Sequence, residues 1–204
     1  MKVVEASTTR KRPYRMTARA QAAAATRQAI VDAYLALLGD RNYDEITLDS
    51  IAERAAVTVQ TVIRRFGSKE ELFATVVRET AEQEVALRAE AAPGDVRDAV
   101  RAVVGHYERI GDVVLRLLGQ EERFAALREV TDAGRQIHYA WVERAFWPFL
   151  EPMSPALRRR RRGQLIALTD IFMWRLLRQD LGFGQRQTEL AITEMVDAVL
   201  NGGK

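Results

Sequence analysis

The sequence has no cysteine, which excludes disulfides, thiolate chemistry and cysteine-rich zinc sites. It has no run of about 18 uninterrupted apolar residues, so we expect no membrane-spanning segment. The opening stretch, MKVVEASTTRKRPYRM, lacks the apolar run and the small-residue cleavage site of a signal peptide, and we therefore expect a cytoplasmic protein. Since 48% of the 204 residues are hydrophobic, the chain can bury a sizeable core.

The sequence also lacks the common signatures of catalysis and metal binding. It contains no glycine-rich phosphate loop, no Ser-His-Asp or Cys-His set, and no pair of histidines at metal-binding spacing. Its two histidines, His106 and His138, have no partner that the sequence can name. We therefore expect a protein that is not an enzyme and that uses neither a metal nor another cofactor.

Positive charge is concentrated near the N-terminus. The net charge is only +3, yet the opening segment has Glu5 as its single acidic residue against seven basic ones: Lys2, Arg10, Lys11, Arg12, Arg15, Arg19 and Arg27. A disordered basic arm over residues 1–16 suits a polyanion such as double-stranded DNA, because each phosphate contact releases counterions. A disordered tail that only aids solubility is the alternative.

Apolar residues recur at i, i+3, i+4 and i+7 almost throughout, which predicts an all-α fold. We expect a first helix at 17–38 and two short helices capped by Thr47 and Thr58. Ser68, answered by Glu71, forms a capping box that opens a long helix to about residue 92. Further helices are expected at about 95–109, 111–119 and 121–147, from 155 through 177, and after Gly184. Pro148, Pro152 and Pro155 predict a loop.

The two short helices, 48–55 and 59–66, have the length and the turn of a helix-turn-helix. On the second helix, four side chains share one polar surface suited to a DNA major groove: Gln60, Thr61, Arg64 and Arg65. The glutamine and arginines are candidates for reading bases, whereas Thr61 and Lys69 are candidates for contacting phosphates. With the helix caps Thr47 and Thr58, these residues form the predicted DNA-binding set. An ordinary solvated face is the alternative.

The stretch TRQAIVDAYLALLGDRNYDEITLDSIAERAAVTVQTVIRRFGSKEELFATVV, residues 26–77, resembles the DNA-binding domain of TetR-family transcriptional regulators. The T-x-x-x-I-A-x-x-A helix, the recognition helix and F-x-S-K-E-x-L all fall at the family's spacing. The family usually has glycine in the turn where this chain has Ala56, an aromatic where it has Ile63, and an aromatic or histidine pair at Arg64 and Arg65. In a left-handed turn, Ala56 would carry about 1 kcal/mol of strain.

The resemblance implies a helix-turn-helix DNA-binding domain at 17–67, a connecting helix at 68–92, and a helical ligand-binding and dimerisation domain at 93–204. It implies a homodimeric transcriptional regulator that represses at a palindromic operator and is released by a small apolar ligand. A ligand-independent architectural DNA-binding protein and a helical protein-interaction module are the alternatives. The operator, the ligand and the sign of regulation are left open by the sequence.

Apolar residues cover every side of the segment 165–177, which predicts burial all round. One flank can pack in its own subunit and the other on a partner, an arrangement that, together with the last helix, resembles the family's dimer interface. A monomer core is the alternative. The predicted dimerisation residues are Leu165, Leu168, Phe172, Leu176, Ile192, Met195, Val196 and Val199.

Aromatic and histidine side chains of the second half could line an apolar ligand pocket. The predicted ligand-binding residues are His106, Tyr107, Trp141, Phe146, Phe172 and Met173, with His138 and Trp174 in the same set. Ordinary core packing is the alternative. The run Arg158 to Arg162 begins a helix, where the dipole disfavours cations, and this predicts a frayed, solvated turn. A second contact with an anion is the alternative.

Overall fold

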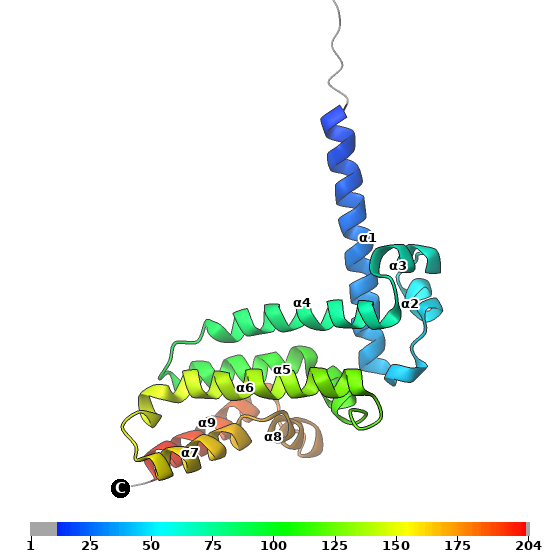
Figure 1. Ribbon diagram of the computed structural model, residues 1–204. Coiled ribbons are helices and arrows are strands. Elements are labelled where there is room, and N and C mark those ends of the chain that lie inside the picture. The colour runs from blue at the N-terminus through cyan, green and yellow to red at the C-terminus, as the bar shows by residue number, and fades with distance from the viewer. Residues whose placement is uncertain (1–11, 203–204) are drawn as a thin grey trace, which may run out of the picture.

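The computed structural model describes residues 12–202, in which every regular element is a helix, so the predicted all-α fold is confirmed (Figure 1). The elements are α1 (Arg12–Asp40), a short 3-10 helix η1 (Tyr43–Glu45), α2 (Leu48–Arg54), α3 (Val59–Phe66), α4 (Lys69–Ala89), α5 (Val96–Leu118), α6 (Ala125–Leu150), α7 (Pro155–Leu168), α8 (Ile171–Arg175), a π-helix η2 (Leu176–Asp180) and α9 (Gln185–Asn201). No helix within residues 12–202 is long and apolar enough to cross a membrane.

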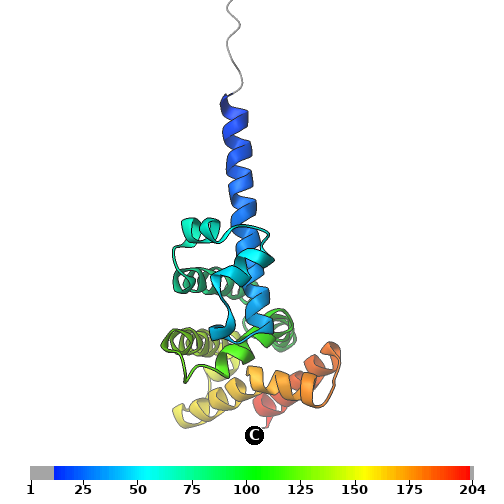
Figure 2. The ribbon, with the colours of Figure 1, turned by 90° about the vertical axis from the view of Figure 1, so that its right-hand side faces the viewer.

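Helix α1 begins at Arg12, earlier than the sequence predicts, and its first half projects away from the other helices (Figures 1 and 2). Residues 12–16 of the predicted disordered arm are therefore helical, while residues 1–11 lie outside the described part of the chain. The stretch AQAAAAT, residues 20–26, explains how a helix persists without packing, because alanine has the highest helix propensity.

The N-terminal core forms where the second half of α1 meets α2, α3 and α4. Tyr34 and Ile30 of α1 are fully buried there, together with Ile51 of α2 and Val62 of α3. Leu117 of α5 and Leu127 of α6 belong to the same cluster. The helix-turn-helix unit therefore shares its core with the ends of two helices from the second half of the chain.

The turn between α5 and α6 is also hydrogen-bonded to the end of α1 and to η1. The side chain of Gln120 accepts from the Tyr43 N–H at 2.9 Å, and Arg116 donates to the Gly39 carbonyl at 3.0 Å. These bonds give the N-terminal unit a second connection to the rest of the molecule, in addition to the continuous helix α4.

The C-terminal core lies between α5, α6, α7, α8 and α9. In Figures 1 and 2, α4 lies on one side of the α5–α6 layer and the last three helices lie on the other. Val103, Phe146, Leu165 and Val196 are fully buried in this core, one each from α5, α6, α7 and α9.

Three further differences from the predicted helices lie in the second half of the chain. Helix α5 continues through Gly111, where a Cβ would come within 2.7 Å of Trp174, so this glycine allows a close approach and is not a helix break. Helix α6 includes Pro148, which the sequence predicts to lie in a loop. The segment 165–177 is not one helix, because α7 ends at Leu168 and Asp170 caps α8 by accepting from the Phe172 N–H at 2.9 Å.

The predicted frayed turn at Arg158 to Arg162 is wrong, because these residues lie within α7 and three of them bind other parts of the chain. Arg158 donates to the carbonyls of Leu150, Glu151 and Met153 at the end of α6. Arg161 donates to the carbonyl of Gly202, and Arg162 pairs with Glu143 at 2.6 Å. These contacts hold α7 against α6 and the end of α9, at the opposite end of the molecule from α3 (Figure 1).

Candidate nucleic-acid interface and ligand cavity

Helix α3 presents one buried and one exposed side. Val62 is fully buried against the N-terminal core, whereas Gln60, Arg64 and Arg65 are exposed. Thr61 is half-buried, and its hydroxyl lies 2.9 Å from that of Thr58. The three long polar side chains are therefore available to a macromolecule that covers this side of the helix.

Both short helices begin at the predicted threonine caps. The Thr47 hydroxyl accepts from the Ser50 N–H at 3.1 Å, and the Thr58 hydroxyl accepts from the Thr61 N–H at 3.2 Å. Each cap satisfies one of the free amide groups at a helix start. Both threonines are exposed, so their side chains fix the helix starts and also face solvent.

The turn between α2 and α3 is left-handed at Ala56, the position where the resembled family usually has glycine. Ala56 has φ 52°, and it is the single non-glycine residue with positive φ in the described part of the chain. Its N–H donates to the Glu53 carbonyl at 3.1 Å, and the Val57 N–H donates to the Ala52 carbonyl at 2.9 Å. This pair of bonds is a Schellman motif, whose left-handed position is usually glycine.

Lys69, at the first position of α4, is partly turned into the protein. Its ammonium donates to the Tyr43 carbonyl and lies 4.2 Å from the centroid of the Tyr43 ring. Burial lowers the pKa of Lys69. An ammonium has three donors, so two remain for an external acceptor such as a phosphate.

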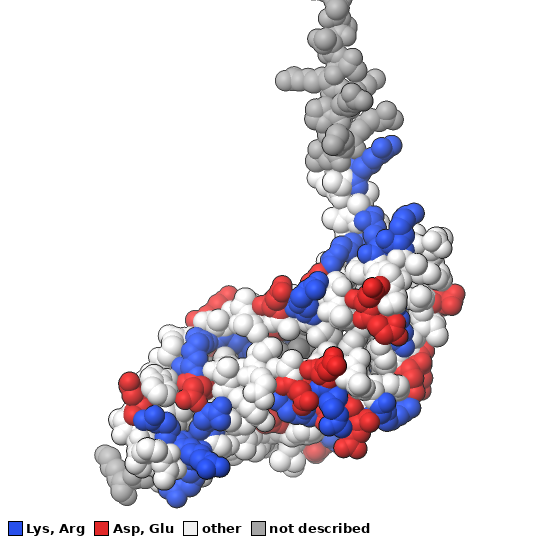
Figure 3. Space-filling view, in the orientation of Figure 1, with Lys and Arg blue, Asp and Glu red and all other residues white. Residues whose placement is uncertain are grey.

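Basic side chains gather where α1, α3 and α4 meet, as the blue surface near the top of the folded part of Figure 3 shows. Arg27, Arg65 and Arg78, from these three helices, line one surface groove. Arg27 also pairs with Glu79 of α4 and lies over the Phe66 ring, 5.4 Å from its centroid. Arg27 thus ties α1 to α3 and α4, while the exposed Arg65 and Arg78 add positive charge beside the recognition helix.

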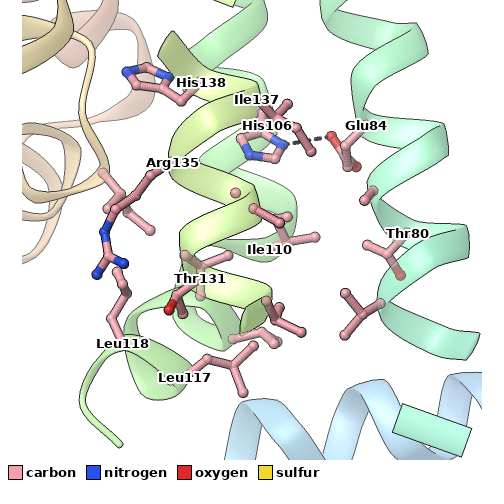
Figure 4. A pocket seen from close by; sticks show the side chains of 18 of the residues that line it. Thr80, Glu84, His106, Ile110, Leu117, Leu118, Thr131, Arg135, Ile137 and His138 are labelled. Atoms are coloured by element: carbon pink, nitrogen blue, oxygen red, sulfur yellow. Dashed lines mark hydrogen bonds and ion pairs between the residues drawn. The ribbon is translucent and has the colours of Figure 1, made fainter. Parts of the chain in front are cut away.

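A cavity of about 230 Å³ lies between α4, α5 and α6 (Figure 4). Its wall is mostly apolar, with Val77, Ile110, Leu118 and Ile137 among the lining residues. Leu35 and Leu38 of α1 close the end nearest the N-terminal unit, and Asp170 to Phe172 line the side next to α8. The cavity therefore touches α1 and α4 as well as the C-terminal helices.

The polar part of the cavity wall is built around Glu84 of α4. The His106 Nδ1 donates to Glu84 at 2.9 Å, as the dashed line in Figure 4 shows. Arg109 donates to both Glu84 oxygens, at 3.0 Å and 2.7 Å. Burial acts to raise the pKa of Glu84, but the hydrogen bonds from Arg109 and His106 outweigh it and the pKa is lowered.

Both histidines of the chain line this cavity, and both are neutral at pH 7. Burial, assisted by the charge of Arg88, lowers the pKa of His106 to about 4. The same two causes lower the pKa of His138 to about 4. Neither imidazole therefore supplies a cation to the cavity near neutral pH.

The N-terminal unit is similar to a known family of regulatory proteins. Residues 30–76 match the family model described as bacterial regulatory proteins of the TetR family. Residues 30–76 are thus a TetR-type DNA-binding domain. No curated protein matches the sequence.

Solved structures extend the TetR-type fold over most of the chain. A TetR-like transcriptional regulator from Rhodococcus sp. RHA1 is similar with a TM-score of 0.67 at 19% identity, covering 88% of this chain and 97% of that one. Another transcriptional regulator from Rhodococcus sp. RHA1 has a TM-score of 0.67 at 16% identity, covering 86% and 96%. A TetR-family regulator from Streptomyces coelicolor has a TM-score of 0.64 at 17% identity, covering 85% and 81%. The chain thus has the fold of a TetR-type transcriptional regulator with a DNA-binding helix-turn-helix.

The predicted ligand residues divide into two groups. His106, Tyr107 and Phe172 line the cavity between α4, α5 and α6, and so does His138. Trp141, Phe146 and Met173 are absent from its wall, because the first two are buried in the C-terminal core and Met173 packs against that core. Trp174 is also a core residue, and its indole N–H donates to Glu108 at 2.8 Å.

Sequence reasoning missed the two buried charged residues of the cavity wall, Glu84 and Arg88. A signal for them exists, because Val77, Ala81, Glu84 and Arg88 continue one helical stripe of α4. When charged residues lie on the side of a helix whose other residues face the protein interior, the pattern indicates that the charges are buried.

The predicted dimerisation residues also divide. Three of them are buried within their own chain and are not free to form a surface contact: Leu165, Ile192 and Val196. Three more are half-buried against the same core: Leu168, Met195 and Val199. Phe172 and Leu176 are 56% and 44% exposed, one turn apart. Three exposed leucines were not predicted: Leu87, Leu181 and Leu190.

Proposed function

We propose that this TetR-type regulator is a homodimeric repressor that binds a palindromic operator and is released when a small apolar ligand occupies the cavity between α4, α5 and α6. The observation that carries the proposal is the reach of this cavity. Its wall includes Leu35 and Leu38 of α1, and it includes Val76 and Val77 of α4. A ligand in it would touch both helices that support the helix-turn-helix.

Two connections can transmit the ligand's effect. Helix α4 runs from Lys69, beside the recognition helix, to Ala89 beyond the cavity. The turn between α5 and α6 holds Tyr43 and Gly39 through Gln120 and Arg116. If the ligand shifts α4 relative to α5 and α6, these connections would move the helix-turn-helix. In a dimer the two heads must fit major grooves about 34–36 Å apart, so a small shift at each head weakens binding.

For DNA recognition, we propose that Gln60, Arg64 and Arg65 contact base edges. Their exposure on one side of α3 supports this, together with the pairing preferences of glutamine for adenine and arginine for guanine. Thr61, Lys69 and the two caps, Thr47 and Thr58, would contact phosphates. The two free donors of the Lys69 ammonium suit that role.

For dimerisation, we propose the exposed apolar residues around α8 and η2. Phe172 and Leu176 are large hydrophobic side chains one turn apart, and Leu181 follows directly after η2. Contiguous exposed apolar groups of this kind commonly mark protein interfaces. Two subunits related by a two-fold axis would present two recognition helices to inverted half-sites.

A substitution that fills the cavity tests this control mechanism without a known ligand. Ala81 lies on α4 and lines the cavity, so Ala81→Phe should push α4 away from α6 as a ligand would. We expect it to weaken binding to a selected operator by about 5- to 150-fold, the usual range of allosteric coupling. Ala86, exposed on the same helix, provides the control variant Ala86→Phe, which should bind the operator normally. Equal operator affinity for both variants would refute control through this cavity.

A further inference from the structure

Arg88 is a buried cation in the cavity wall. It lies on α4, and only 5% of its surface is exposed. Its guanidinium carbon is 5.7 Å from the centroid of the Trp141 ring, and its Nε has no hydrogen-bond partner. Among the side chains that the structure describes, no carboxylate lies within 4.0 Å of its guanidinium. A guanidinium stays protonated in proteins, so this cation is unpaired.

The two carboxylates among the residues that line the cavity already have other partners. Glu84, one turn before Arg88 on α4, accepts from Arg109 and His106. Burial lowers the pKa of Arg88, and Tyr107 and Glu84 oppose this shift only in part. Asp170 caps α8, and its charge acts on His138 and Tyr107. Neither acid therefore forms a direct ion pair with Arg88.

His138 does not add a second cation or donor at this end. The Thr169 hydroxyl donates to the Leu165 carbonyl at 2.7 Å, so it can only accept from the His138 Nε2–H, 3.3 Å away. The proton of this neutral imidazole thus lies on Nε2. The His138 Nδ1 is left as a buried acceptor without a partner. Among the described residues that line the cavity, the cation without an acidic partner is therefore Arg88.

Away from Arg88 the cavity wall is hydrocarbon. The apolar lining comes from α4, α5 and α6, and includes Val77, Val85, Ile110, Val114, Leu118 and Ile137. A molecule that fills this space must be apolar along most of its length. The same molecule must end in a group that can pair with a guanidinium.

We propose that the cavity binds an apolar carboxylate, with its carboxyl group paired to Arg88 and its hydrocarbon body between α4, α5 and α6. The inference rests on the proposed function, in which this cavity is the regulatory site. A carboxylate matches the planar guanidinium through two parallel N–H···O bonds. A neutral molecule of the same size would leave the Arg88 charge buried and unpaired, which is unfavourable.

The test is a set of binding titrations on the full chain without DNA. Octanoate is compared with octanol and octylammonium, and phenylbutyrate with phenylbutanol, so that each pair differs only at the head group. We expect each carboxylate to bind about 10- to 100-fold more tightly than its neutral partner, the range expected for hydrogen bonds to a charged group. Octylammonium should bind more weakly than octanol.

Arg88→Met should abolish the preference for the carboxylates while the affinity for octanol stays the same or rises. The thermal midpoint of the ligand-free protein should not fall in this variant, because the substitution removes an unpaired buried charge. The matched control is Arg101→Met, an exposed arginine of α5 that pairs with Asp98, and it should bind like the wild type.

Equal binding of carboxylate and alcohol, a preference retained in folded Arg88→Met protein, or no saturable binding of either carboxylate would overturn the ligand class. Failure of the control mechanism gives a different result. If the carboxylates bind through Arg88 but leave operator affinity unchanged, the ligand class stands and release from DNA is refuted.

Discussion

Replacing Ala56 with glycine should stabilise the protein, although it removes a side chain. Ala56 holds the left-handed position of the turn between α2 and α3, at φ 52°. That conformation costs an L-residue about 1–2 kcal/mol, and glycine is free of this cost. Glycine loses about 0.4–1 kcal/mol through the greater freedom of the unfolded chain. The net gain should be about 0.5–1 kcal/mol, or about 1–4 °C in thermal midpoint for a protein of this size.

The neighbouring Ala55 provides a matched control for this prediction. It has φ −82° at the end of α2 and packs on the N-terminal core, so Ala55→Gly should lower stability by about 0.5–1 kcal/mol. Urea unfolding followed by far-UV circular dichroism measures both variants. If both substitutions changed stability in the same direction, or if Ala56→Gly were destabilising, the strain assigned to this turn would be wrong.

Four further outcomes follow from the structure. Arg64→Ala should weaken the binding free energy for a selected operator by about 1–3 kcal/mol and leave binding to random DNA unchanged. Lys69→Ala should weaken binding to both kinds of DNA and reduce the salt dependence of the affinity by about one unit of slope. Identical losses for the two variants would contradict the division of roles. Phe172→Asp should give monomers in sedimentation at micromolar concentration, whereas Leu87→Asp, at an exposed leucine on α4, should leave the dimer intact. A wild-type monomer would refute the interface. Arg158→Ala should destabilise the protein by about 1.5–3 kcal/mol, because it removes hydrogen bonds to carbonyls at the end of α6. The exposed Arg160→Ala should cost less than about 0.5 kcal/mol. Equal effects of the two substitutions would exclude a role for Arg158 in capping α6. The free energy of unfolding should fall as pH drops from about 6.5 to about 4, because the unfolded chain's histidines take up protons there while His106 and His138 stay neutral in the folded protein. His138→Gln should reduce this fall. A flat pH profile would show that the histidines are solvated.

The helix-turn-helix could be predicted from sequence because its signals are local. Thr47, Thr58 and Ser68 each cap the helix that the sequence assigns to them, and each cap requires residues only three positions apart. The left-handed turn at Ala56 is different, because it could be expected only from the resemblance to a family that usually has glycine there. Local capping and helical periodicity fix these elements before any long-range contact forms.

The second half was harder to predict because a helical stripe shows that a side is buried but not what covers it. The pattern of α9 predicts that Ile192 and Val196 contact a partner subunit, yet α5 of the same chain packs against this helix. Likewise, Gly111 resembles a helix break in the sequence. Only the position of Trp174, 63 residues later, shows that it is a packing site.

The cavity residues were hard to predict for the same reason, because a sequence pattern does not show which side chains face one another. Aromatic content drew the prediction to Trp141 and Phe146, which fill the core instead. The residues that give the cavity its chemistry, Glu84 and Arg88, are charged and resemble solvated helix residues when read one at a time. Their burial becomes apparent only from their register on α4.

Selection of binding sites from random double-stranded DNA by the full chain tests the central claim most directly. A dimer with two exposed recognition helices should enrich an inverted repeat whose half-site centres lie one helical turn, about 10 base pairs, or a multiple of it apart. The enriched sequence should lose its advantage when either half-site is scrambled. Recovery of no common sequence, or of a single asymmetric site bound by one chain, would contradict the account.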